Sequence, residues 1–411
     1  MKYSELYPIL KQLFAQQSEE IALPGSQIKI INPTFTSHHS DILPGTSDHI
    51  CSKHNCHFHN RYVPYKTELT EKQYHPSLHI PDSDILSNMV FRYTIFKPVT
   101  PQKSDGVILL FHGLNEKQWE KYLPWAYRLS ESTGKAVILF PIAFHMNRAP
   151  AEWGDPRLML DVSKQRQTKY PVMAQSSFAN AAISSRIQIL PQRLFWSGRQ
   201  TYSDILQLVR EIKNGELPFI SPDASIDFFA YSIGAFLSEI LIMTNSEGFF
   251  DHSKLFLFCG GTTLDRTYPV SRFILDSEAN IALYAFFMEH LDRECQMDDR
   301  LNHYFNEDHR SGRYFRSMIS IHRHRDLREG RFKEIGSKIK AVALQKDVVI
   351  PPVEVLNTLK GDYRDLPTNV QILDFPFDYT HVNPFPLKNI KHSLVDDAFD
   401  QVFDSAANHL S

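Results

Sequence analysis

The sequence contains 411 residues, of which 42% are hydrophobic and 22% charged, and its formal net charge is −3. A chain of this length can bury a large core. Its near-balanced charge gives no electrostatic reason to expect nucleic acid or an anionic membrane surface as a partner. The four cysteines are too few to cross-link a chain of this length through disulfides.

The start of the chain has the spacing of a short amphipathic helix. It lacks a basic segment followed by an uninterrupted apolar run, so we expect no secretory signal. No stretch approaches the roughly 18 consecutive apolar residues of a membrane-spanning helix. We therefore expect a cytoplasmic protein without a membrane partner. Residues 21–85 are polar and rich in histidine and proline, and we assign 1–85 to an N-terminal extension.

Strand-like and helix-like segments alternate through residues 86–411, which we assign to one domain. Short apolar runs are typical of strands buried on both faces. The strands are expected at 88–96, 106–113, 136–142, 225–230, 254–261, 338–345 and 369–375. This alternation predicts an α/β fold with a doubly wound, mostly parallel sheet flanked by helices.

Two segments are too long to be ordinary connections between a strand and its helix, namely residues 143–198 and 262–336. Each follows an expected strand. Open α/β sheets bind ligands at the carboxyl ends of their strands. We therefore expect both segments to be insertions that form a cap over that edge of the sheet.

The segment SIDFFAYSIGAFLSEI, residues 225–240, places Ser232 between an expected strand and an apolar helix. A catalytic serine requires such a tight turn, with small residues two positions before and after it. Gly234 meets this requirement, and Ala230 adds one methyl group where glycine is more common. An A-x-S-x-G motif also occurs in turns without a catalytic role, so other residues of the chain must show whether Ser232 is a nucleophile.

Three further features follow in a consistent order. His112 and Gly113 end the strand at 106–113, and the backbone N–H of Leu114 or Asn115 could join that of Ile233 in an oxyanion hole.

Asp347 follows the penultimate strand, and His381 follows the last one. A carboxylate in the first position can orient the imidazole in the second. Asp265, Asp374 and Asp378 remain alternative partners for the histidine.

With this order of serine, acid and histidine, and with its His-Gly pair, the chain resembles the α/β-hydrolase superfamily from about residue 88 to the C-terminus. The resemblance implies Ser232 as the nucleophile, His381 as the general base and acid, and Asp347 as the acid that orients it. We expect a serine hydrolase that cleaves a carboxylic ester or related acyl bond of a small molecule through an acyl-enzyme. The alternative is a hydrolase-like protein that binds a small molecule without turnover.

No nucleotide-binding glycine motif and no H-E-x-x-H motif is present, and we expect no cofactor. The segment CSKHNCHFH, residues 51–59, contains possible zinc ligands. Its Cys-x4-Cys spacing is not a common zinc-finger spacing, and no second paired half lies nearby. We interpret it as a solvated loop and expect no metal site.

Other residues are candidates for contact with the substrate. His145 and Arg148 follow the strand at 136–142 and lead toward the expected cleft. The basic run 309–333 is interpreted as a solvated face of the cap, although its arginines could instead bind an anionic substrate. We expect an apolar cleft in which Phe286 and Phe287 restrict the substrate to short or medium acyl chains.

Overall fold

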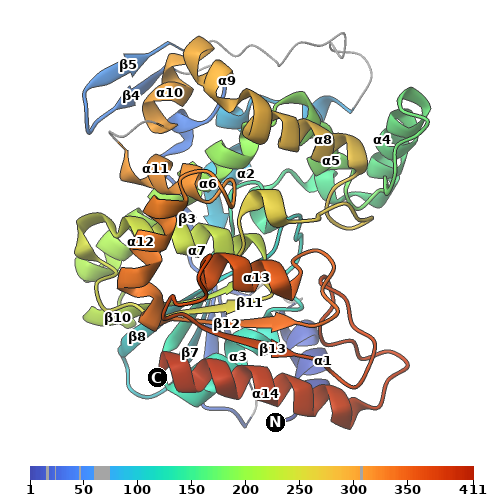
Figure 1. Cartoon of the computed structure of the whole chain (residues 1–411). Helices are drawn as coiled ribbons and strands as arrows, with labels where there is room; N and C mark the ends of the chain where they lie inside the picture. The colour runs from blue at the N-terminus through green and yellow to red at the C-terminus, as the bar shows by residue number, and fades with distance from the viewer. Residues whose placement is uncertain (15–17, 24, 46–47, 60–74, 306–308) are drawn as a thin grey trace.

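The computed structural model describes residues 1–14, 18–23, 25–45, 48–59, 75–305 and 309–411, and its centre is a nine-stranded sheet (Figure 1). In sheet order the strands are β1 (Glu20–Ala22), β2 (Ile28–Ile31), β7 (Thr94–Pro98), β9 (Ala136–Leu139), β8 (Ser104–Phe111), β10 (Ile220–Tyr231), β11 (Leu255–Phe258), β12 (Ile339–Leu344) and β13 (Asn369–Leu373). The six strands from β9 to β13 are parallel, whereas β1, β2 and β7 pair antiparallel. The predicted doubly wound, mostly parallel sheet is confirmed.

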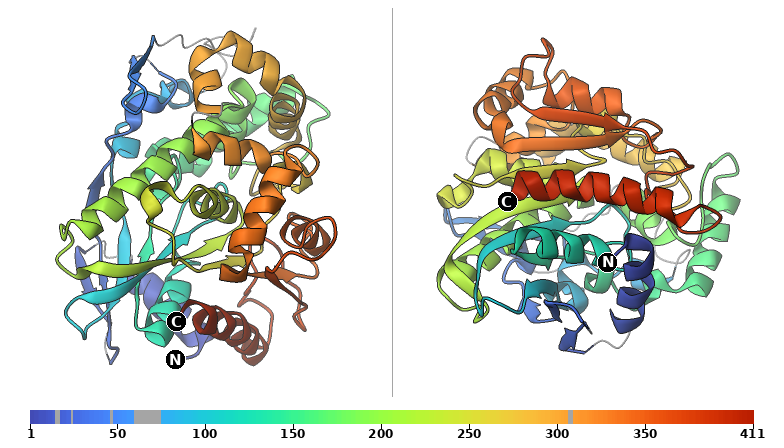
Figure 2. Two further views of the ribbon diagram at one scale, coloured as in Figure 1. Left: turned by 60° about the vertical axis from the view of Figure 1, so that its left-hand side comes forward. Right: turned by 90° about the horizontal axis from the view of Figure 1, so that it is seen from below.

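Helices cover both faces of this sheet, because the apolar side chains of its parallel strands are buried on both sides. One face carries α1 (Tyr3–Phe14), α3 (Leu123–Thr133) and α14 (His392–Leu410), which contact one another (Figure 2). The other face carries α6 (Arg193–Lys213), α7 (Ile233–Thr244), α12 (Arg325–Ile335) and α13 (Pro352–Leu359). Among the helices of the described residues, none combines the length and apolar character needed to cross a bilayer.

The order of the strands determines where a ligand site can form. From β8 the chain moves to β9 on one side, and then returns to β10 on the other side of β8. In an open α/β sheet, such a reversal leaves a crevice beyond the carboxyl ends of the two strands. The loops that follow β8 and β10 therefore meet at this crevice, and they carry the His-Gly pair and Ser232.

The N-terminal extension is less separate from the domain than its composition indicates. Its strands β1 and β2 lengthen the main sheet, so a boundary at residue 85 does not divide the molecule into two cores. Asp82 is buried and forms ion pairs with Arg186 and Arg193, which ties this segment to the cap and to α6. The strands are only three and four residues long, which is too short to give a strong periodic pattern.

Two further pairs of short strands lie outside the main sheet. β3 (Thr34–Thr36) pairs with β6 (Val90–Arg92), so the strand expected at 88–96 is divided between α2 (Leu86–Met89), β6 and β7.

A hairpin of β4 (His49–Cys51) and β5 (Cys56–Phe58) contains most of the cysteine- and histidine-rich segment. The interpretation of residues 51–59 as a solvated loop is wrong for Cys51, which is buried, and for His54, which is half-buried. His57 and His59 are exposed.

Most of both long insertions lies above the carboxyl edge of the sheet, in the upper half of Figure 1, but the last helix of the second insertion, α12, packs on a face of the sheet. The first contains α4 (Pro156–Lys169) and α5 (Ala181–Ile189), and the second contains α8 (Ser277–Tyr284), a π-helix (Ala285–His290), α9 (Leu291–Met297), α10 (Asp299–Phe305) and α11 (Arg310–Ser317). α5 packs against α8. Arg166 on α4 donates two hydrogen bonds of 2.8 Å to Asp276, which caps α8, and neither side chain is exposed. A bidentate pair of this kind fixes orientation, so the two insertions form one cap.

Candidate active site

Ser232 occupies a strained turn between β10 and α7. Its φ of 56° and ψ of −121° are unfavourable for any residue with a Cβ, at a cost of about 1–3 kcal/mol. Two residues later, a Cβ on Gly234 would lie 2.7 Å from the Cβ of Phe111 and 2.8 Å from the carbonyl oxygen of His112. Strand and helix therefore approach so closely that only glycine fits there. Ala230 is accommodated in the buried strand upstream.

The structure brings Ser232, His381 and Asp347 into one chain of hydrogen bonds. His381 Nε2 lies 2.8 Å from Ser232 Oγ, and His381 Nδ1 lies 2.7 Å from Asp347 Oδ2. The exposed fractions are only 8% for Ser232, 4% for His381 and 3% for Asp347, so water competes little for these bonds. Because the carboxylate accepts from Nδ1–H, Nε2 presents its lone pair to the serine hydroxyl.

Asp347 is itself held in place by the backbone. Its second oxygen, Oδ1, accepts hydrogen bonds of 2.9 Å from the N–H groups of Val349 and Ile350. The three alternative acids lie elsewhere: Asp265 accepts from the N–H of Ile321, Asp374 accepts from the hydroxyl of Tyr379, and Asp378 is exposed. Of the four acids, Asp347 is the one in contact with His381.

The backbone N–H groups of Leu114 and Ile233 donate a hydrogen bond to none of the described residues. Both residues line the same cleft beside Ser232, as expected for a pair of donors to an oxyanion. Asn115 does not line this cleft. Its side chain donates to the carbonyls of Ala179 and Phe273 and so fastens the loop to both insertions.

Two tyrosines whose identity no recognised sequence motif specifies support these groups. The hydroxyl of Tyr122 accepts from the N–H of Gly113 at 3.0 Å and donates to Glu116, which fixes the His-Gly loop. Tyr231 stacks on the ring of His381 and donates a hydrogen bond to its carbonyl oxygen. The position of Tyr231 directly before Ser232 is the one sequence feature that could have indicated it.

Two adjoining pockets flank Ile233, with about 640 and 590 Å³ of empty space that includes their openings to solvent. Ser232 lines the second pocket. The residues common to both are Leu114, Leu194, Ile233 and Phe236. The remaining side chains around Ser232 are also mostly apolar, and they come from the strand ends and from the cap: Gly261, Thr262, Leu264, Thr267, Pro269, Ile274, Leu275, Leu283, Val349 and Ile350.

Of the two residues predicted to contact the substrate, one lines a pocket and the other does not. His145 lines the first pocket, and burial lowers its pKa to about 4. Its Nδ1 donates to the carbonyl of Ala143 at 2.9 Å, while its Nε2 has no hydrogen-bond partner among the described residues. Arg148 lines neither pocket. It is completely buried and pairs with Asp204 at 2.8 Å, so it serves the packing of the first insertion.

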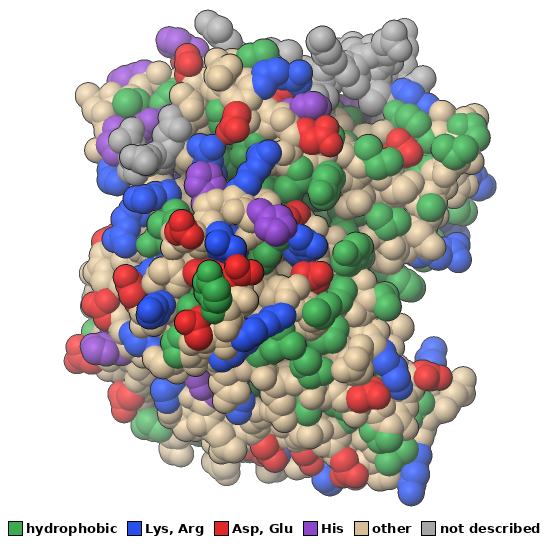
Figure 3. Space-filling view, viewed as in Figure 1, with side chains coloured by type: hydrophobic (Ala, Val, Ile, Leu, Met, Phe, Trp, Pro, Cys, Tyr) green, Lys and Arg blue, Asp and Glu red, His purple; other side chains and the backbone are tan. Residues whose placement is uncertain are grey.

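No arginine of the basic run 309–333 lines either pocket. Arg316 pairs with Asp292 and Arg325 with Asp362, and Figure 3 shows charges of both signs interspersed over the face that carries α12 and α13. Phe286 and Phe287 are buried but line neither pocket. Phe287 packs instead behind Phe315, which does line the first pocket.

A parallel sheet whose strand order reverses beside β8, with a serine on the turn after β10, defines the α/β-hydrolase fold. Within it, the chain belongs to the family of unknown function DUF6051, which matches residues 1–411. No curated protein matches the sequence.

Several solved structures are similar. One is carboxyl esterase 2 from the mycorrhizal fungus Tuber melanosporum, with 12% identity over 78% of this chain and 81% of that chain and a TM-score of 0.42. A second is a thermostable esterase from Pseudomonas putida, with 10% identity over 98% of this chain and 89% of that chain and a TM-score of 0.41. At such identities no substrate carries over to this chain.

Proposed function

We propose that this protein is a serine hydrolase that cleaves a carboxylic ester, or a related acyl bond, of a small apolar molecule. The proposal rests on one observation above all: an unbroken chain of hydrogen bonds runs from Asp347 through His381 to Ser232. The serine stands on a strained turn and faces the apolar pocket that Leu114 and Ile233 also line. A plain strand–helix turn needs neither the strain nor a buried acid and imidazole.

In the proposed reaction, Ser232 Oγ attacks the carbonyl carbon while His381 Nε2 takes the hydroxyl proton. Asp347 remains ionised and stabilises the imidazolium through Nδ1–H. The oxyanion accepts hydrogen bonds from the backbone N–H groups of Leu114 and Ile233. Collapse of the tetrahedral intermediate breaks the bond to the leaving alcohol, which takes the proton from Nε2. Water then attacks the acyl-enzyme with the same assistance, which releases the acid and restores the serine.

The lining of the pockets favours an apolar acyl group. Leu194 and Phe236 belong to both pockets, and Leu283 from the cap closes the second. The first pocket is also lined by the polar residues Arg199, Ser197, Tyr202 and Ser311. His145 lines it too. With Nδ1–H bonded to a carbonyl and a pKa near 4, its neutral ring presents the lone pair of Nε2. That nitrogen is itself buried, so it is not exposed to a substrate in the pocket.

Hydrolysis of p-nitrophenyl esters by the wild type and by Ser232→Ala, His381→Ala and the double variant tests this function. Each single change should reduce kcat by several orders of magnitude, and the double variant should be scarcely worse, because the residues act as one unit. A burst of p-nitrophenol in the wild type would reveal the acyl-enzyme. Wild-type hydrolysis no faster than that of the variants would favour the alternative of a binding protein.

A further inference from the structure

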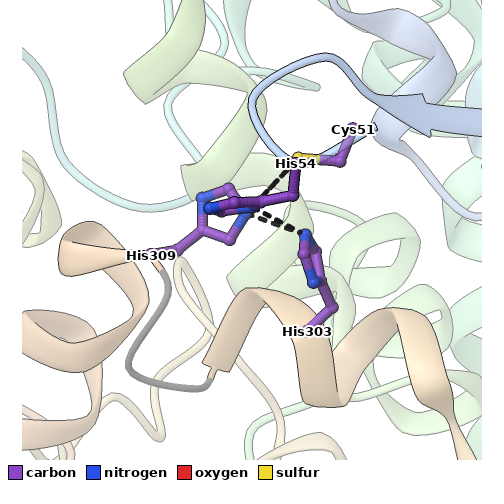
Figure 4. A group of neighbouring side chains, drawn as sticks. All are labelled: Cys51, His54, His303 and His309. Carbon is purple, nitrogen blue, oxygen red and sulfur yellow. Dashed lines mark hydrogen bonds between the residues drawn. The ribbon is translucent and has the colours of Figure 1, made fainter. Parts of the chain in front are cut away.

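Four side chains from distant parts of the sequence converge beside the cap, and Figure 4 shows them pointing toward one another. Cys51 ends β4 and His54 follows it in the hairpin turn, whereas His303 belongs to α10 and His309 immediately precedes α11. One ligand atom from each residue lies within 4.8 Å of all the others. Cys51 and His309 are buried, and the other two are half-buried.

Four of the six distances between these atoms are close to those of a tetrahedral zinc site, and the other two do not exceed 4.8 Å. Cys51 Sγ lies 3.6 Å from His54 Nδ1 and 3.5 Å from His309 Nε2. His303 Nε2 lies 3.4 Å from His54 Nδ1 and 3.0 Å from His309 Nε2. With Zn–S and Zn–N bonds of about 2.3 and 2.05 Å, the edges of a regular tetrahedron are about 3.6 Å for S···N and about 3.3 Å for N···N. Three of these four edges match the expected values closely, and the 3.0 Å edge is shorter by about 0.3 Å. The remaining two pairs, Cys51 with His303 and His54 with His309, lie within 4.8 Å, so the side chains would draw closer together around a bound ion.

We propose that Cys51, His54, His303 and His309 bind one Zn²⁺ ion. A thiolate with three imidazoles suits Zn²⁺, whereas Mg²⁺ and Ca²⁺ prefer oxygen ligands. With the ion bound, the four lone pairs face one cation instead of one another. Four protein ligands leave no open coordination position, so the site is structural and supplies no activated water.

A second layer of contacts holds one of the ligands in place. The ring of Tyr304 stacks on His309 with a centroid distance of 4.5 Å. The hydroxyl of Tyr304 donates to His49 Nε2 at 2.5 Å, and Nδ1 of His49 donates to Asp41 at 2.8 Å. Gly312 on α11 lies against the backbone of Tyr304 with no space for a Cβ. Such supporting partners are typical of the surroundings of protein metal ligands.

The site would connect the N-terminal hairpin with the part of the cap that roofs the cleft. His309 precedes α11, and Ser311 and Phe315 of that helix line the first pocket. A bound ion therefore holds α10, α11 and the hairpin together and sets the position of Phe315. This role is independent of the proposed hydrolysis.

Metal analysis of the purified, untagged protein tests the proposal. We expect about one zinc ion per chain after gel filtration. Removal of the metal with a strong chelator should lower the melting temperature, and added Zn²⁺ should restore it. Co²⁺ added to the metal-free protein should give the visible bands of tetrahedral cobalt together with a thiolate-to-metal charge-transfer band in the near ultraviolet.

Variants identify the ligands. Cys51→Ser should abolish the charge-transfer band, and His303→Ala should weaken the affinity for zinc by more than the roughly tenfold that loss of a supporting partner alone costs. Cys56→Ser and His57→Ala are matched controls on the same hairpin, because neither residue belongs to the cluster, and both should retain the metal.

Two results would overturn the proposal. The first is a wild-type protein that purifies without stoichiometric metal, shows no tetrahedral cobalt spectrum and melts at the same temperature with and without chelator. The second is a metal that remains at full occupancy in both Cys51→Ser and His303→Ala. The measurements on the wild type decide the question even if a variant fails to fold.

Discussion

Tyr231 and His381 are joined twice, by rings that stack at 5.4 Å with an interplanar angle of 20° and by a hydrogen bond from the tyrosine hydroxyl to the histidine carbonyl. Tyr231 is the last residue of β10 and precedes Ser232 directly. The strand that positions the serine therefore also positions the loop that carries the imidazole. Because Tyr231 is buried, this contact persists without competition from water.

We expect Tyr231→Phe to preserve the stack and lose the hydrogen bond. Small displacements of a catalytic group can cost up to about a hundredfold in rate, so kcat should fall roughly tenfold with little change in KM. Tyr127→Phe, a change on the outer helix α3, serves as the control and should leave kcat unchanged. An unaltered kcat in Tyr231→Phe, together with an unaltered melting temperature, would mean that the stack alone positions His381.

Asp347→Asn should keep the fold and remove control of the imidazole tautomer, with a loss in kcat of up to roughly four orders of magnitude. Asp378→Asn is the matched control, because Asp378 lies close to His381 in sequence but is exposed. Steady-state kinetics on one ester checks both variants. A larger loss in kcat from Asp378→Asn than from Asp347→Asn would mean that Asp347 only stabilises its own turn.

The contacts among Ser232, Asp347 and His381 could be predicted from the sequence because each residue follows a strand of one parallel sheet. The carboxyl ends of such strands meet at one edge, so local patterns are sufficient. The convergence of Cys51 with His303 and His309 could not be predicted in this way. It depends on how the second insertion folds back over the N-terminal hairpin, which no local pattern specifies. The prediction that Arg148 contacts the substrate is wrong for a related reason, because its ion-pair partner Asp204 lies on a different element.

The apolar lining predicts how substrates are selected. For an acyl series, kcat/KM should increase by about fourfold per methylene, or about 0.8 kcal/mol, until the pocket is full. Arg199 lines the first pocket, but no arginine or lysine lines the pocket that contains Ser232. Ionic strength should therefore have little effect on KM for a substrate bound beside Ser232. A KM that increases steeply with salt and does not depend on chain length would make the basic run part of the site.

Glu239 on α7 predicts a dependence of stability on pH. The side chain is completely buried, its carboxyl oxygens have no hydrogen-bond partner among the described residues, and burial raises its pKa well above the usual 4.5. Above pH 4.5 the unfolded chain loses this proton while the native protein retains it. The free energy of unfolding therefore falls as pH rises toward the native pKa, by up to about 1.4 kcal/mol per pH unit.

Glu239→Gln removes this ionisation. The variant should gain stability relative to the wild type, and the gain should be larger at about pH 8 than at about pH 5 in denaturant titrations. Glu19→Gln, at an exposed position, should show no such trend. A difference that shrinks as pH rises would show that the native protein holds Glu239 ionised.

The most direct test of the central claim is covalent labelling by a fluorophosphonate, which reacts with a serine that an adjacent histidine activates. Intact mass and peptide mapping would be compared for the wild type, Ser232→Ala, and Ser197→Ala, a pocket serine that does not contact His381. The account predicts one label per chain on Ser232 in the wild type and in Ser197→Ala, and none in Ser232→Ala. An unlabelled wild type, or a label that persists in Ser232→Ala, would contradict it.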